Sequence, residues 1–513
     1  MMQDPRSRYV RKLHGAYKRG KLHVFIGAGI SLVSGFPGWE SLNKSLLQGY
    51  LAATIGNSTP AAMVASPNIQ TTADAIYDVL GRDAVADFVH NASPRQFVPL
   101  LASALYQGRS VEDLPLASIH YQIAAFSGQA HLSTLNLDPL LELALTRRFP
   151  KKLWQEFRSP DLDGKARRRQ HLVEHLHGWL DPDGTRSDRL VLTESQYIEL
   201  TGDPKAPANQ SLRRMLSGEN VTLVLGMSLA DPNFRRVLYF LNKRGLSSRE
   251  RVYVVTVRQQ PVIDHYVEMH WARRGLRLLF LQSYEEVPGL LRDIQWGEPK
   301  SGELPRWIGA ATDWRRSRLP DPLIFTKAWQ NIAHGSLSAL CEQIKKMFAV
   351  QAEEDINAAL FIPFSGGKRS SNLRMAAFSE TKATPRIARM RAQNRSFQLK
   401  RGREQGIGGV SYASGTIRAV AFGEGEVDIN FTPRMISGWV SRKGYRDWRS
   451  ILSVPVIDTP YWLPVAVITL TSNMAEPFWK RFGRKADLLE LELYAIIRRT
   501  GAFCLRDFTA GTK

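Results

Sequence analysis

The chain has 513 residues and a formal net charge of +21, with 43% hydrophobic and 23% charged residues. This length predicts two or three domains, and this balance is typical of a folded protein. The sequence holds no apolar run long enough to span a bilayer, and residues 1–21 are polar and basic. Cys341 and Cys504 are too few for a disulfide framework or a cysteine metal site. We therefore expect a cytoplasmic protein without a metal.

The positive charge is concentrated in two stretches of the second half of the chain. They contain Arg386, Arg389, Arg391, Arg395, Lys400, Arg401 and Arg403, and then Arg442, Lys443, Arg446 and Arg449. Such charge attracts nucleic acid, nucleotides or acidic proteins, and a solvated basic surface is the alternative. Neither a zinc-finger spacing nor an aromatic RNA-binding pattern accompanies the charge. An anionic partner is thus expected, but its class stays open.

The first predicted strand runs into a glycine-rich turn. Val24–Ile26 is apolar, Gly27 and Gly29 follow it, and Ser31 stands where a helix can begin. Glycines allow a close approach of backbone N–H groups to a bound group, and a helix N-terminus adds partial positive charge. The pattern predicts a cradle for a pyrophosphate. A tight turn is the alternative, because Leu32 occupies the place of the third glycine of a dinucleotide-binding fingerprint.

Further apolar runs alternate with helical stretches up to about residue 297. They are Leu132–Leu135, Leu190–Leu192, Thr222–Leu225, Val252–Val255 and Leu276–Leu281. Strands separated by helices imply crossover connections, so we expect an α/β fold with a Rossmann-like parallel sheet. Residues 41–125 are expected to form a helical insertion that covers the sheet edge or a bound nucleotide.

A different pattern follows residue 297. Residues 298–334 are polar and contain proline and tryptophan, which predicts a linker. A helix is expected after residue 335, then strands at Ala359–Ile362 and Leu373–Phe378, a glycine turn over 406–415, and a closing helix. We therefore expect a first domain over 1–297 and an α+β domain over 335–513.

Four motifs in the first domain, taken in order, resemble the sirtuin (silent information regulator two) superfamily. They are Gly27-Ala28-Gly29-Ile30-Ser31, the T-x-N-x-D element Thr134–Asp138, His177-Gly178, and the strand that ends in Gly226-Met227-Ser228. The variants Gly35-Phe36-Pro37-Gly38-Trp39 and Thr193–Tyr197 are similar to the sirtuin-like NAD hydrolases of bacterial antiphage defence. The resemblance covers residues 15–295 and implies that NAD⁺ is the substrate.

The resemblance also implies roles for individual residues. Asn136 would hold a water near the anomeric carbon, Asp138 would accept a hydrogen bond from the carboxamide, and His177 would act as a general base. The expected binding residues are Gly27, Ala28, Gly29 and Ser31 at the phosphates or ribose, Pro37 and Trp39 at the pocket wall, and Gly226 and Ser228 at the adenosine half. His175 would be only a neighbour of the base. Helix capping by Asn136 and Asp138, and a structural turn at His177, are the alternatives.

Sirtuin deacylases carry a zinc module with two pairs of cysteines, which two distant cysteines cannot supply. Water is then the expected acceptor, so the chain is expected to be an NAD⁺ glycohydrolase that yields nicotinamide and ADP-ribose. A non-catalytic module that senses NAD or ADP-ribose, and a protein deacylase or ADP-ribosyltransferase, are the alternatives.

The second domain resembles GAF domains. The resemblance rests on the glycines at Gly406, Gly409 and Gly415, on the S-x-x-x-V-P-V run Ser450–Val456, and on the strand Pro464–Leu470, where Ala466 replaces a common glycine. It implies a sensor or assembly element that restrains an NAD-depleting effector of abortive infection. A homo-oligomer and an anionic trigger (nucleotide, nucleic acid or acidic phage protein) are expected with it.

Overall fold

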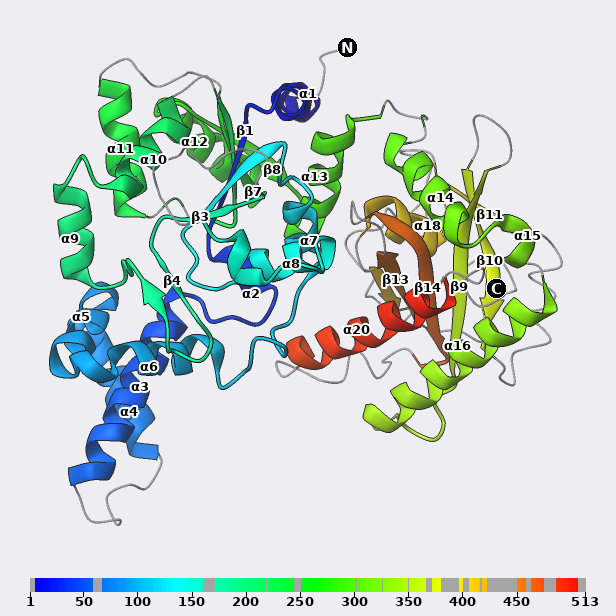
Figure 1. Ribbon diagram of the computed structural model, residues 1–513, viewed down its shortest axis with the longest axis horizontal. Coiled ribbons are helices and arrows are strands. Elements are labelled where there is room, and N and C mark those ends of the chain that lie inside the picture. Colours follow the sequence, from blue (N-terminus) through cyan, green and yellow to red (C-terminus); the bar gives the residue numbers. More distant parts are fainter. Residues whose placement is uncertain are drawn as a thin grey trace. The chain divides into compact units, whose positions relative to one another are not determined.

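The computed structural model separates the chain into two compact units, Met1–Val287 and Pro288–Lys513 (Figure 1). The structure describes residues 5–58, 67–159, 171–217, 220–227, 229, 231–243, 251–299, 303, 305–324, 326–348, 350–365, 371–379, 396–399, 406–415, 418–421, 450–457, 463–474 and 486–505.

The first unit is built on a six-stranded parallel sheet with the strand order β3-β2-β1-β6-β7-β8. The strands are β1 (Leu22–Ile26), β2 (Ala130–Thr134), β3 (Val173–His175), β6 (Val221–Leu225), β7 (Val252–Val257) and β8 (Leu276–Leu281). Counted within this sheet, the order is 3-2-1-4-5-6, which is that of the doubly wound dinucleotide-binding fold. The expected α/β class and Rossmann-like sheet are confirmed.

One predicted strand of this sheet is wrong. Leu190–Leu192 forms no strand, because this segment leads directly into helix α9 (Glu194–Gly202). Thr193 caps that helix, and the Leu192 N–H donates to the side chain of Gln196 at 2.8 Å. Leu192 is therefore buried in the segment that leads into α9, and not in a strand. A short antiparallel pair, β4 (Trp179–Leu180) and β5 (Ser187–Asp188), precedes this segment.

Helices flank the sheet. The helices of this unit are α1 (Pro5–Lys18), α2 (Gly29–Leu32), α3 (Trp39–Ser58), α4 (Pro67–Leu80), α5 (Arg82–Ala92), α6 (Pro94–Tyr106), α7 (Ser118–Ala124), α8 (Leu140–Arg148), α9, α10 (Pro207–Ser217), α11 (Pro232–Lys243) and α12 (Pro261–Ala272). Those from α3 to α7 form the insertion that was expected over residues 41–125. Helices α3 to α6 gather beside the sheet (Figure 1), and their core includes Leu46, Phe97 and Leu101. Leu137 and Leu140 belong to the same core, so the insertion holds the segment that follows β2.

The second unit contains a six-stranded antiparallel sheet with the order β11-β10-β9-β14-β13-β12. Its strands are β9 (Ile356–Ser365), β10 (Ser371–Phe378), β11 (Ser396–Gln398), β12 (Arg418–Ala421), β13 (Ser450–Ile457) and β14 (Pro464–Ser472). Its helices are α14 (Arg306–Arg318), α15 (Asp321–Ile324), α16 (Lys327–Met347), α18 (Gly406–Ser414) and α20 (Ala486–Cys504); α13 (Val287–Trp296) begins at the boundary. Helices α16 and α20 contact each other and the sheet.

Two expectations for the second half differ from the structure. The described part of 298–334 holds α14, α15 and the start of α16 rather than a loose linker, since Trp307, Ile308 and Ala311 are buried in the core of the second unit. The expected glycine turn is the helix α18 with Gly415 behind it at φ +63°. Both basic stretches, 386–403 and 442–449, have all of their arginines and lysines outside the described residues. None of the described helices is long and apolar enough to cross a membrane.

Candidate active site

The sequence motifs meet at one edge of the first sheet. Strands β1, β2, β3 and β6 are parallel, so the segments that follow them emerge at the same carboxyl-terminal edge. The strand order reverses between β1 and β6, and such a reversal leaves a crevice in which doubly wound proteins bind ligands. Gly27 follows β1, Asn136 follows β2, His177 follows β3 and Gly226 follows β6.

Ser31 joins two of the predicted catalytic residues. The Asn136 Nδ2 donates to Ser31 Oγ at 2.8 Å, and the same hydroxyl donates to Asp138 Oδ2 at 2.7 Å. All three residues are buried, with 4% of Ser31, 8% of Asn136 and 6% of Asp138 exposed. The structure thus brings Ser31, after β1, together with two sequence-predicted residues that lie more than a hundred positions later, after β2.

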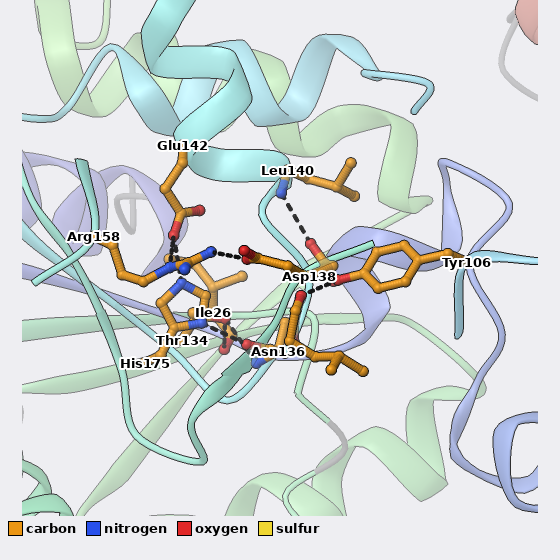
Figure 2. A network of polar contacts seen from close by, with 11 residues as sticks. Ile26, Tyr106, Thr134, Asn136, Asp138, Leu140, Glu142, Arg158 and His175 are labelled. Atoms are coloured by element: carbon orange, nitrogen blue, oxygen red, sulfur yellow. Dashed lines mark hydrogen bonds and ion pairs between the residues drawn. The ribbon is translucent and has the colours of Figure 1, made fainter. Parts of the chain in front are cut away.

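Hydrogen bonds hold the backbone N–H, the backbone carbonyl and the side-chain Nδ2 of Asn136. Its backbone N–H donates to Thr134 Oγ1 at 3.0 Å, and its backbone carbonyl lies 2.8 Å from His175 Nδ1 (Figure 2). Its side-chain oxygen Oδ1 is buried and has no hydrogen-bond partner among the described residues. Buried polar atoms are nearly always satisfied, so this oxygen points to a water or a ligand hydroxyl as its missing donor.

A cluster of charged residues lies beside the segment that contains Asn136 (Figure 2). His175 Nε2 lies 2.6 Å from Glu142 Oε1, and Arg158 pairs with Asp181 at 3.2 Å. Burial alone would lower the pKa of His175, but the charge and hydrogen bond of Glu142 raise it above its ordinary value. The protonated imidazole donates to both neighbours. His175 is therefore a positioning residue for Asn136, which extends its expected role as a mere neighbour.

Asp138 also caps a helix. Its Oδ1 accepts from the Leu140 N–H at 3.2 Å, at the start of α8. Burial raises the pKa of the Asp138 carboxyl, while the Ser31 hydroxyl works against that rise. The capping alternative thus holds for Asp138, and it is compatible with ligand contact because a carboxylate has about four acceptor positions.

His177 is held in a turn rather than in a strand. Strand β3 ends at His175, and Gly178 continues the turn at φ +78°, where a Cβ would collide with the backbone of Asp188 and Arg189. Burial lowers the pKa of His177, so the imidazole is neutral near pH 7.

Tyr197 and Asp231 orient the His177 imidazole. Tyr197 Oη donates to Asp231 Oδ2 at 3.4 Å and lies 3.3 Å from His177 Nδ1. Since the phenol hydrogen goes to Asp231, its oxygen accepts from an Nδ1–H, which leaves Nε2 as the basic nitrogen. Tyr197 lies in the Thr193–Tyr197 run that the sequence singled out, although no role was predicted for it.

The glycines of the first turn pack against the protein. A Cβ on Gly29 would lie 2.8 Å from the Gly226 carbonyl oxygen, and one on Gly27 would lie equally close to that atom. The Gly29 N–H already donates to Gly226 O at 2.8 Å. Helix α2 is only four residues long, so its dipole is small. These glycines therefore allow the turns after β1 and β6 to pack closely together. The cradle for a pyrophosphate stays a prediction.

The remaining predicted binding residues are placed less centrally. Trp39 begins α3 and packs, half-buried, against the core of the helical insertion. Pro37 lies two residues before it and is also half-buried. Ala28 lies between the two glycines at the start of α2, and its backbone carbonyl accepts a hydrogen bond from the Ser31 N–H at 2.9 Å. Ser228 lies outside the described residues.

No motif of the sequence predicts the supporting roles of Glu142, Arg158 and Tyr106. Glu142 lies within the run that contains Asp138, so its position there was a usable signal. Arg158 is in a segment without a pattern, yet its guanidinium lies 3.6 Å from the centre of the Trp179 ring. Tyr106 comes from the helical insertion, and its hydroxyl donates to the backbone carbonyl of Leu180.

Comparisons with known proteins relate part of the first unit to one domain family. Residues 130–279 match the family model of the SIR2-like domain. The chain is 23% identical over 299 residues to the defense-associated sirtuin 2 of Bacillus subtilis, and the match covers 56% of this chain and 27% of that relative. The chain thus spans about a quarter of the length of this curated relative.

Solved structures give weaker likenesses. A Sir2 homologue in complex with NAD is 14% identical, covers 56% of this chain with 93% of its own, and has a TM-score of 0.28. A GAF domain structure is 16% identical, covers 38% of this chain with 86% of its own, and has a TM-score of 0.21. Residues 130–279 of the first unit are thus similar to the SIR2-like domain by the family model, and this matched segment contains Asn136, Asp138 and His177.

Proposed function

We propose that the first unit is an NAD⁺ glycohydrolase, which cleaves NAD⁺ to nicotinamide and ADP-ribose. The unpartnered Oδ1 of Asn136 carries this proposal, because it is a buried acceptor fixed by Ser31 and His175 at the ligand-binding edge of the sheet. The match of residues 130–279 to the SIR2-like domain supports it.

The proposed reaction breaks the bond between the nicotinamide nitrogen and the ribose anomeric carbon. Nicotinamide leaves with the electron pair of that bond, and the oxygen of a water forms the new bond to the anomeric carbon. Asn136 Oδ1 accepts a hydrogen bond from this water and orients it. His177 Nε2 takes the proton that the water loses, and its lowered pKa keeps it able to do so near pH 7. Asp138 accepts from the nicotinamide carboxamide.

The proposal extends to a role in the cell. The relative from Bacillus subtilis is named as a defence-associated sirtuin, which supports an effector of antiphage defence that depletes NAD⁺. In this proposal the second unit acts as a GAF-like sensor or assembly element, the chain forms a homo-oligomer, and an anionic trigger raises the activity above a basal rate that the purified chain already has. An unrestrained hydrolase would consume the NAD⁺ of its own cell, so a second domain that restrains it has a clear use.

The test is to incubate the purified full chain with NAD⁺ and to measure nicotinamide and ADP-ribose by chromatography. We expect equal amounts of both products, and none from Asn136→Ala. Asn242→Ala is the matched control, since the Asn242 side chain bonds the Arg274 carbonyl away from the candidate site, and it should keep the parent rate. Binding of NAD⁺ by the parent without cleavage would favour the sensing module, and cleavage at the parent rate by Asn136→Ala would refute the role of Asn136.

A further inference from the structure

The first unit has a concave site at the edge of its sheet that lies opposite the candidate active site. A hollow of about 400 Å³ is lined by Arg11, Lys12, Gly15, Arg19, Val221, Arg251 and Tyr253. Val221 is the first residue of β6 and Arg251 directly precedes β7, so the hollow lies at the amino-terminal ends of these strands. The candidate active site lies at their carboxyl-terminal ends.

The lining of this hollow is strongly basic. Four of its seven residues are arginine or lysine, and none is acidic. Arg11, Gly15 and Arg19 follow one another at intervals of four, so they lie along one face at the end of α1. The sequence has no acidic residue between Asp4 and Glu40. Cations held close together repel one another, and a bound anion removes that repulsion.

Gly15 makes room for one of these cations. A Cβ at this position would lie 3.1 Å from Arg19 Nη1, so the guanidinium lies where a side chain would otherwise be. A glycine inside a helix is less stable than an alanine, and here it allows Arg19 to lie over the helix. The Arg19 side chain has no hydrogen-bond or ion-pair partner among the described residues. Its donors are therefore available to a ligand.

The chemistry of the hollow favours phosphate. Guanidinium groups bind phosphate through two parallel hydrogen bonds, and the guanidinium-bearing residues Arg11, Arg19 and Arg251 all line the hollow. The wall is formed by the buried Tyr253, whose ring lies 5.3 Å from that of Tyr9. The volume falls within the range of sites for small molecules. We propose that this hollow binds the phosphate groups of a nucleotide-sized anion, such as a nucleoside triphosphate.

The test is calorimetric titration of the full chain with inorganic tripolyphosphate and with ATP, at about 0.15 M salt. The double variant Arg11→Gln with Arg19→Gln should bind both at least about tenfold more weakly, since each lost bond is charge-assisted. The matched control is Arg95→Gln with Lys151→Gln, which removes the same charge from exposed positions outside the hollow. It should change the dissociation constant by less than about twofold.

A second variant separates binding from folding. Gly15→Ala should raise the melting temperature, because alanine favours the helix, and should weaken tripolyphosphate binding because it displaces Arg19. Asn136→Ala should bind as the parent does, because the two sites are separate. The proposal is overturned if the parent binds neither ligand, if the control pair weakens binding as much as the Arg11 and Arg19 pair, or if Gly15→Ala leaves the affinity unchanged. Binding of a single-stranded oligonucleotide alone would overturn it in favour of a nucleic-acid surface.

Discussion

Replacing Ser31 by alanine removes the hydroxyl that joins Asn136 to Asp138. Two bonds are lost, of 2.8 Å from the Asn136 amide and of 2.7 Å to the Asp138 carboxylate. A neutral hydrogen bond contributes about 1 kcal/mol net and one to a charged group about 2 kcal/mol, so we expect Ser31→Ala to lower the free energy of unfolding by about 3 kcal/mol. The assay is urea unfolding of the full chain, with a separate transition fitted for each unit.

Ser34→Ala is the matched control for this experiment. Ser34 is fully buried three residues later, and its hydroxyl accepts a single bond of 3.3 Å from the Ala117 N–H. Its replacement should cost about 1 kcal/mol. If Ser31→Ala destabilised the protein no more than Ser34→Ala, the hydroxyl would not hold Asn136 and Asp138 as described.

Two further predictions concern the stability of the first unit. Gly29→Ala should destabilise it by more than about 2 kcal/mol, because the new methyl would meet the Gly226 backbone at 2.8 Å, and thermal unfolding measures this. Burial lowers the pKa of His120 to about 4 from its ordinary 6.5. The unfolded state therefore binds the proton more readily, so stability should be lost as the pH falls from about 6.5 towards about 4, by about 3 kcal/mol, and His120→Leu should remove this loss.

Each of these changes has a control in the same unit. Gly202→Ala adds a methyl that meets nothing within 4 Å, so it should leave the unfolding temperature nearly unchanged. A loss as large as that of Gly29→Ala would mean that the contact with Gly226 is not the cause. His265 is exposed, and His265→Leu should keep the acid dependence of the parent. An equal acid dependence in His120→Leu would assign the proton uptake to another group.

The sequence predicts the fold of the first unit where strands are apolar throughout. Val24–Ile26 in β1 and Val252–Val255 in β7 are buried runs of this kind, and both strands have a neighbouring strand on each side. Strand β3 could not be predicted from an apolar run, because two of its three residues, Glu174 and His175, are polar. Glu174 is satisfied by Ser133 at 3.0 Å and by Ser211 at 2.8 Å, and these partners are visible only in the folded chain.

The candidate site, too, could be predicted only in part from the sequence. Asn136, Asp138 and His177 lie in local motifs at strand ends, so their order in the chain indicates that they share an edge. The role of Arg158 depends on its packing against Glu142 and Asp181, which no local pattern encodes. The sequence predicts that Gly29 lies close to a bound pyrophosphate. Its close contact with the Gly226 backbone depends on the folded chain and could not be predicted from the sequence.

The central claim is that His177 acts as the base in NAD⁺ hydrolysis, and the rate of nicotinamide release tests it most directly. The full chain, His177→Ala and the exposed-site control His265→Ala are compared near pH 7 at saturating NAD⁺. We expect the parent and the control to release nicotinamide at the same rate and His177→Ala to be slower by about 10² to 10⁴. Release by His177→Ala at the parent rate would contradict the account.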